Sequence, residues 1–248
     1  MPAREQAAAW VASQVGGDVI VACDPAMCSA LLARGVPAGN MLILRSAASD
    51  PLGSDLVLAT AAVRSQFGGR LASVYAPQVI ASFGSGALRI DVRAVAPDGA
   101  AAFRTELAAD MAARRAAGRQ LLGNSRISTS AAARAALLGG QPDARLLAAL
   151  AAMAAAGPVR IESFGDSGPG AAPGTPLRGA ELTAPGAPAA AAARLADMLA
   201  FVRAQRSPYL AERAAIGRGA HGSPVLSVEF AAPSPVGLLQ TQATPLAN

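Results

Sequence analysis

Short apolar runs of strand type alternate with alanine-rich stretches of helical period along most of the chain. The clearest example is an apolar run at residues 18–22 (DVIVA), a helix over residues 24–34 and a second run at residues 41–44. An unbroken apolar run is typical of a strand that is buried on both faces. Asp24 and Pro25 supply an N-cap and a first-turn proline for the helix. This order predicts a β–α–β unit and an α/β or α+β fold.

A long predicted helix divides the chain into two small subdomains with mixed sheets. Residues 1–97 form the first α/β subdomain, residues 98–122 are the connecting helix, and residues 123–232 form the second. Residues 233–248 are rich in Pro, Thr and Gln, which predicts a disordered tail. Strands are expected at residues 18–22, 41–44, 55–58, 79–83, 88–95, 159–164, 177–182 and 225–230, and helices at residues 3–15, 24–34, 60–75, 100–122, 144–156 and 189–206. Ser128 or Ser130 can cap a further short helix that ends at Gly139-Gly140, and Asp143 caps the helix at residues 144–156.

Composition limits the classes of function. Hydrophobic residues make up 52% of the chain, and about half of them are Ala, so we expect a thin, helix-rich core. Aromatic content is 4%, which disfavours base-stacking platforms for nucleic acid. The net charge is +5, and the chain contains Arg but no Lys, a bias typical of GC-rich coding as in actinobacteria. The arginines are scattered, which favours solvated faces, although acidic partners remain possible.

The two cysteines, Cys23 and Cys28, lie at a predicted strand–helix junction. Their close spacing makes a disulfide possible, while two buried thiols or a redox pair remain as alternatives. No CxxC motif is present, which disfavours the redox reading. With His221 as the only histidine, the two cysteines cannot complete a zinc site without carboxylates, so no metal is expected.

No apolar run approaches the ~18 residues of a membrane span. The N-terminal stretch MPAREQAAAW lacks the apolar region of a signal peptide. We therefore expect the chain as given to be soluble, and it could be the soluble part of a longer, membrane-anchored protein.

The GDSG stretch at residues 165–168 has the look of a serine nucleophile. Ser167 needs a base, nearly always His, and an orienting acid. His221 is the only candidate base, and it follows the serine in a helix-rich chain, unlike the order and all-β fold of trypsin-like proteases. We therefore interpret Asp166 and Ser167 as turn residues that bond local amides, with Ser167 as a weak catalytic candidate.

Two surfaces are the candidate binding sites. One is the helix start at Asp24 and Cys28, where free amides could hold an anion. The other is the Gly- and Pro-rich loop at residues 165–176, with Asp166 and Ser167, followed by Arg178. The SFGSG stretch at residues 82–86 precedes a strand, so it predicts a hairpin turn and not a phosphate loop.

The first part of the chain resembles a known module. VIVACDPAMCSALLARGVP, SDLVLAT and VIASFGSGALRIDVRAV are similar to the soluble end module of actinobacterial membrane glycosyltransferases, over residues 10–96. The resemblance implies an extracytoplasmic location and carries no catalytic signature. A disulfide between Cys23 and Cys28 is consistent with that compartment.

The second part resembles D-alanyl-D-alanine carboxypeptidase-like zinc peptidases over residues 122–231. The resemblance is carried by NSRISTSAAARAALLGGQPDARLLAALAAMAAAGPVRIESF and PLRGAELT. In RGAEL, Glu181 stands where the family has a zinc-binding Asp, the family's first His is missing, and VLSVEF lacks the late His, since His221 stands too early. The resemblance therefore implies a degenerate copy that holds no zinc and has Glu181 as a weak catalytic candidate.

These observations predict a non-enzymatic extracytoplasmic envelope module without a cofactor. It would bind a protein partner or a cell-wall polymer as the soluble part of a membrane-anchored protein. One alternative is a serine or degenerate metal-dependent hydrolase that acts on cell-wall material through Ser167 or Glu181. The other is a basic cytoplasmic nucleic-acid-binding protein, which the scattered arginines do not favour.

Overall fold

The computed structural model describes residues 1–46, 50–165, 168–219 and 222–243. As predicted, it is a mixed α/β structure, about 45% helical and 23% strand, with two mixed five-stranded sheets. The chain forms two compact units. Unit 1 is Met1–Glu106 with Gly168–Thr175, and unit 2 is Leu107–Ser167 with Pro176–Asn248.

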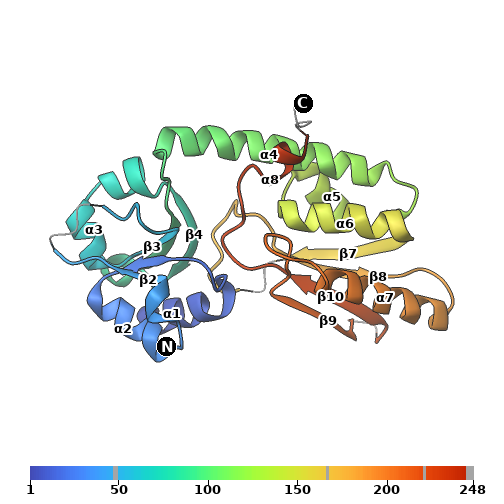
Figure 1. Ribbon diagram of the computed structural model, residues 1–248, viewed down its shortest axis with the longest axis horizontal. Coiled ribbons are helices and arrows are strands. Elements are labelled where there is room, and N and C mark those ends of the chain that lie inside the picture. Colours follow the sequence, from blue (N-terminus) through green and yellow to red (C-terminus); the bar gives the residue numbers. More distant parts are fainter. Residues whose placement is uncertain (47–49, 166–167, 220–221, 244–248) are drawn as a thin grey trace. The chain divides into compact units, whose positions relative to one another are not determined.

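The sheet of unit 1 has the strand order β2-β1-β3-β5-β4 (Figure 1). β1 lies parallel to β2 and β3, whereas β5 is antiparallel to β3 and β4. The β–α–β unit predicted from the sequence is therefore present at one end of a mixed sheet. The strands are β1 (Val21–Cys23), β2 (Met41–Ile43), β3 (Leu56–Ala59), β4 (Gln78–Phe83) and β5 (Ile90–Ala94).

Helices cover both faces of this sheet. α1 (Ala3–Gln14) and α2 (Pro25–Ala33) pack on one face (Figure 1). There the ring of Trp10 in α1 lies 6.3 Å from the ring of Phe83 in β4. α3 (Ala61–Phe67) and the π-helical turn η2 (Leu71–Tyr75) pack on the other face. All four residues of β3 are consequently buried. The short 3-10 turns are η1 (Ala38–Asn40) and η3 (Gly86–Leu88).

A distant segment of the chain covers the outer edge of β4. Ser82 donates its backbone N–H to the Gly170 carbonyl (2.8 Å), and Ala172 donates to the Ile80 carbonyl (2.9 Å), so residues 170–172 pair with β4 through an isolated antiparallel bridge. Gly170 has a φ of +89°, and a Cβ there would lie 2.7 Å from the Phe83 ring, so glycine is required. The loop that we predicted as a contact surface thus closes a sheet edge over its described residues.

The sheet of unit 2 has the strand order β6-β7-β8-β10-β9. β6 and β7 are parallel, and the pairs β7–β8, β8–β10 and β10–β9 are antiparallel. The strands are β6 (Ile127–Thr129), β7 (Val159–Gly165), β8 (Gly179–Thr183), β9 (Arg213–Arg218) and β10 (Pro224–Glu229).

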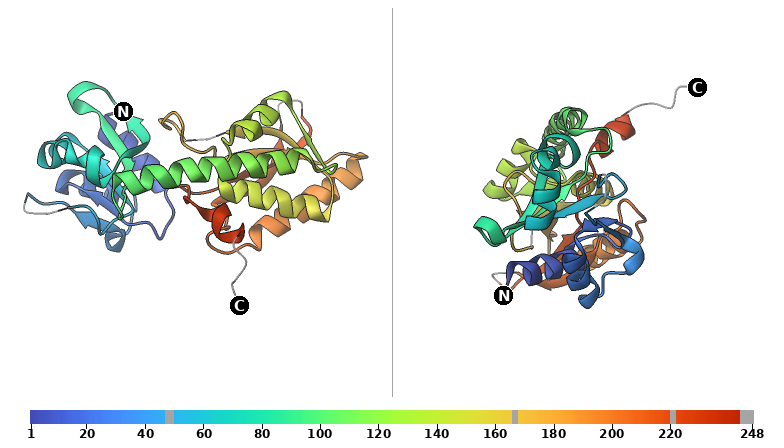
Figure 2. Two further views of the ribbon diagram at one scale, coloured as in Figure 1. Left: turned by 90° about the horizontal axis from the view of Figure 1, so that it is seen from above. Right: turned by 90° about the vertical axis from the view of Figure 1, so that its left-hand side faces the viewer.

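One hydrophobic core lies on one face of this second sheet. It joins Ile161, Leu182 and Leu226 of the strands to apolar side chains of the helices. The 23-residue helix α4, the long green helix of Figure 2, starts in unit 1 and ends in unit 2. Its residue Leu121 belongs to this core. The helices of this layer are α4 (Ala100–Leu122), α5 (Ala131–Gly139), α6 (Ala144–Ala156) and α7 (Pro188–Arg203), and α8 (Leu238–Ala243) lies against α6.

Buried charges fix the start of α6 in unit 2. Asp143 is the N-cap of α6 and is fully buried, and Arg145 donates to both of its carboxylate oxygens at 3.0 and 2.7 Å. Arg145 also donates to the carbonyl of Ala231 and lies over the Phe230 ring. This ion pair ties the helix start to the chain beyond β10.

Three elements were missed in the sequence. β6 and β9 join the sheet where no strand was expected, and α8 forms within the stretch predicted as a disordered tail. β6 and β9 have little apolar alternation of their own, and their pairing with β7 and β10 defines them. In the described part of the chain, no helix is both long and apolar enough to cross a membrane.

Candidate functional site

The second sheet has an open face, opposite the helices. Along β10 the buried Leu226 and Val228 alternate with the exposed Ser227, and along β8 the buried Leu182 follows the exposed Glu181. Successive side chains of a strand point to opposite faces, so Ser227 and Glu181 lie on the face away from the core. No helix packs on this face among the described residues of unit 2.

A bulge in β7 places a serine beside Glu181. The register shifts between Ile161 and Ser163, so that Ser163 lies opposite Glu181 while Ile161 stays in the core opposite Leu182. Ser163 donates its hydroxyl to Glu181 Oε2 at 3.1 Å. Glu181 in turn lies opposite Ser227 on β10. Three neighbouring strands therefore present a row of small hydroxyl groups around one carboxylate.

A second row along the same face carries an ion pair. Glu229 of β10 lies opposite Gly179 of β8 and Arg213 of β9. Arg213 Nη2 lies 2.9 Å from Glu229 Oε2. A Cβ at position 179 would lie 3.0 Å from the Gly165 carbonyl oxygen. Glycine avoids this close contact and leaves the surface between β7 and β8 without a side chain there.

These rows enclose a groove of about 420 Å³ that belongs to unit 2 alone. Its floor consists of glycine, alanine and serine, and Arg213 and the carboxylates of Glu181 and Glu229 supply its charge. The lining residues are Ser163, Gly165, Gly179, Ala180, Glu181, Arg213, Ala215, Ser227, Val228 and Glu229.

The groove can accept a cationic hydrogen-bond donor. Arg213 compensates the charge of Glu229, whereas Glu181 receives a hydroxyl hydrogen bond and no ion pair from the described residues. An ammonium or guanidinium group that entered the groove would therefore find one uncompensated carboxylate. None of the described lining residues is aromatic, so the stacking surface that commonly orients a sugar ring is not supplied here.

The candidate residues in the loop after β7 are not all described. Asp166, Ser167 and His221 lie outside the described residues, so the prediction of a weak serine site stays a prediction. Arg178 is buried, with 4% of its surface exposed, and donates to the Phe230 carbonyl at 3.0 Å. The described residues contain no group of three side chains that could hold a metal ion, so Glu181 belongs to no such group.

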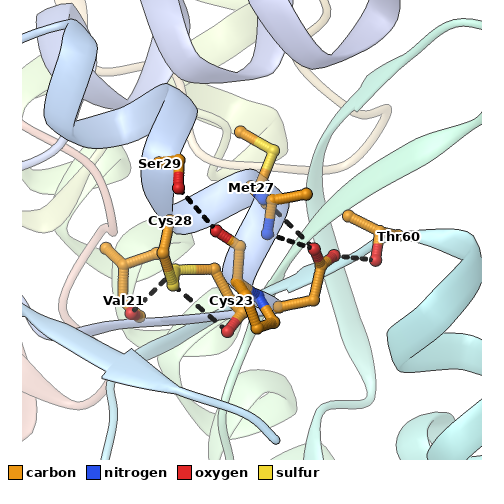
Figure 3. Close-up of a disulfide and its surroundings, with 9 residues drawn as sticks. Val21, Cys23, Met27, Cys28, Ser29 and Thr60 are labelled. Atoms are coloured by element: carbon orange, nitrogen blue, oxygen red, sulfur yellow. Dashed lines mark hydrogen bonds between the residues drawn. A yellow bond between two sulfur atoms is a disulfide. The ribbon is translucent and has the colours of Figure 1, made fainter.

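At the start of α2, Cys23 and Cys28 lie at disulfide distance, with their sulfur atoms 2.06 Å apart (Figure 3). Both residues are buried. Asp24 caps the helix by accepting from the amides of Ala26 and Met27, and Thr60 donates its hydroxyl to the other carboxylate oxygen. Asp24 therefore occupies two of the amides that an anion would use, and anion binding here stays a prediction without further support.

Most residues of the groove were not predicted from the sequence. Ser163, Ser227, Glu229 and Arg213 are far apart along the chain and meet only through strand register. The sequence signal that could have indicated this open face is the alternation of apolar and polar residues in the last strand, because it predicts that one side of the strand faces solvent.

Comparisons with protein-family models, with curated proteins and with solved structures found no match. The resemblances to the glycosyltransferase end module and to the zinc peptidases therefore stay predictions, and function has to be argued from the geometry.

Proposed function

We propose that the protein is a non-enzymatic, extracytoplasmic envelope module that binds a protein partner on the open face of the second sheet. The observation that carries this proposal is the groove at Glu181, on a sheet face that the described helices of unit 2 leave uncovered. A contiguous uncovered surface with few, well-placed polar groups is typical of a recognition site.

The chemistry of the groove favours a protein segment with a basic side chain over a cell-wall polymer. The floor of small residues leaves room for an incoming chain, and the carboxylate of Glu181 suits an Arg or Lys side chain. A glycan would find no ring to stack on among the described lining residues.

The disulfide-distance pair supports the compartment. Disulfides persist in oxidising environments and are rare in reducing ones, which is consistent with an extracytoplasmic location. Attachment to a membrane through a segment outside this chain, and an origin in an actinobacterial envelope, belong to the same proposal.

The proposal is tested by NMR titration of the full chain with acetyl-Gly-Arg-Gly-Arg-Gly-amide. We expect shifts at the amides of Ser163, Glu181 and Ser227, and Glu181→Gln should weaken binding about fivefold to tenfold because it removes the uncompensated charge. Glu212→Gln is the matched control, since this exposed carboxylate of unit 2 lies outside the groove.

Equal binding by both variants, or shifts elsewhere on the molecule, would contradict the proposed surface. Covalent labelling of Ser167 by a fluorophosphonate probe would contradict the non-enzymatic role, because only an activated serine reacts with it.

A further inference from the structure

The four edges of the two sheets differ in how they are protected. β2 and β6 are edge strands of only three residues each. The edge of β4 is covered in part by residues 170–172, which form an isolated bridge with it. β9 is the remaining edge strand, and it extends over six residues. Short or covered edges are a common protection against strand pairing, so β9 is the exception.

The pairing of β9 with β10 shows which backbone groups point outward. Arg218 lies opposite Pro224, which has no N–H to exchange, whereas Gly219 donates to Ser223 at 2.9 Å. Hydrogen-bonded and non-hydrogen-bonded pairs alternate along an antiparallel ladder. Gly217, Ala215 and Arg213 therefore bond to β10, and the backbone groups of Ala214, Ile216 and Arg218 point away from the sheet.

One of these outward groups already accepts a hydrogen bond from an arginine. Arg203 Nη2 donates to the Ala214 carbonyl at 3.1 Å, which agrees with the outward direction. Within the described part of the chain, the N–H and C=O of Ile216 have no hydrogen-bond partner. The edge therefore offers an N–H and a C=O for a further strand.

The side chains around this edge are apolar and basic. Ile216 is 41% exposed and Leu210 is 53% exposed. Arg203, Arg213 and Arg218 are exposed as well. Unit 1 has equal numbers of acidic and basic residues, so the net charge of +5 belongs to unit 2. A second copy of β9 would bring arginines against arginines, whereas an acidic strand would complement them.

We propose that β9 binds an extended, acidic segment of a partner protein, which joins the sheet of unit 2 as an additional strand. The main chain of Ile216 supplies hydrogen bonds, its side chain covers an apolar residue of the added strand, and the arginines select acidic side chains. Arg213 and Ala215 of β9 also line the groove at Glu181, but Ile216 does not, and the inference holds whether or not that groove binds a partner.

The test uses the full chain and the peptide acetyl-Thr-Val-Glu-Val-Glu-Val-Thr-amide. NMR should show that the Ile216 amide becomes protected from hydrogen exchange when the peptide binds, because it gains a hydrogen-bond acceptor. A peptide with Lys in place of Glu should bind about tenfold more weakly, since it repels the arginines.

Ile216→Pro is the decisive variant, because it removes an N–H that bonds to nothing in the described chain. Proline is tolerated on an edge strand where its missing N–H faces solvent, so the sheet should persist. We expect about tenfold weaker peptide binding, whereas Ile216→Thr, which keeps the N–H, should bind within about threefold of the wild type. Arg213→Gln gives an independent variant. Arg213 lies on the opposite face of β9 from Ile216, where it meets the glutamates of a peptide whose valines cover Ile216, so its loss should reduce binding of the acidic peptide.

Several outcomes would overturn the inference. These are an absence of binding by the acidic peptide, equal binding by the lysine peptide, or an Ile216 amide that exchanges equally fast with and without the peptide. The Glu181→Gln titration reports on the groove alone, so failure of one proposal is distinguishable from failure of the other.

Discussion

The two sheets of this protein have the same number of strands and differ in how their faces are used. In unit 1, helices cover both faces, and every residue of β3 is buried. In unit 2, the core lies on one face, and from Leu226 to Val228 β10 alternates between buried and exposed residues. A sheet that is covered twice can contribute to function only at its edges and loops, whereas a sheet that is covered once keeps a whole face for recognition.

The two units also fix the start of a helix by different means. In unit 1, the disulfide-distance pair of Cys23 and Cys28 ties the end of β1 to the first turn of α2. In unit 2, the buried ion pair of Asp143 and Arg145 performs the equivalent task at α6. The different chemistry allows each unit to be perturbed separately.

The largest expected effect is the loss of the buried charge in unit 2. Asp143→Ala should destabilise unit 2 by about 3–5 kcal/mol, because it leaves the buried guanidinium of Arg145 without its carboxylate and removes a helix cap. Hydrogen exchange of the α6 amides measures this unit directly. Asp197→Ala, at an exposed position of α7, is the control and should change stability by less than about 0.5 kcal/mol.

A change of less than about 1 kcal/mol on Asp143→Ala would show that the ion pair does not hold the helix start. The fluorescence of Trp10, the only tryptophan, reports on unit 1 and should be unchanged in this variant.

The next largest effects are the losses of stability caused by polar substitutions in one strand of each sheet. In β3, Val57→Asn and Leu58→Asn should each cost about 3 kcal/mol or more, since both residues are fully buried and face opposite helix layers. In β10, Leu226→Asn should cost as much, whereas Ser227→Asn should be within about 0.5 kcal/mol of the wild type. Hydrogen exchange in both units measures the four variants. A large cost at Ser227 would mean that the second sheet is covered on both faces.

The smallest of the three effects is the loss of the cysteine pair. Replacing Cys23 and Cys28 by Ala should destabilise unit 1 by about 2 kcal/mol, because the pair closes only a short loop in the unfolded chain. Denaturation followed by Trp10 fluorescence measures this, and the α6 amides of unit 2 provide the control. An equal loss in unit 2 would show that the two units do not respond separately.

Much of the fold could be predicted from local sequence signals. The caps Asp24, Ser130 and Asp143 start the helices as expected, and α4 spans the predicted residues 100–122. Caps and helical periods act within one or two turns, so they can be seen in the sequence. β9 could not be predicted, because Arg213–Arg218 becomes a strand through its pairing with β10.

The candidate site could be predicted only in part. Glu181 was singled out through a resemblance, but its neighbours Ser163 and Ser227 come from strands on either side of it. Their approach depends on the register between β7, β8 and β10 and on the bulge after Ile161, which no local pattern encodes. Asp166 and Ser167, which belong to the stretch that resembles a serine nucleophile motif, lie outside the described residues.

The accessibility of the second sheet is tested most directly by thiol labelling of single-cysteine additions to the native chain. Both natural cysteines are paired, so the wild type should not react with a maleimide under non-reducing conditions. Ser227→Cys should label at a rate close to that of an unstructured peptide, while Leu226→Cys, Val57→Cys and Leu58→Cys should be protected until the chain unfolds. Protection of Ser227→Cys in the folded protein would contradict the account, because it would show that the open face of the second sheet is already covered.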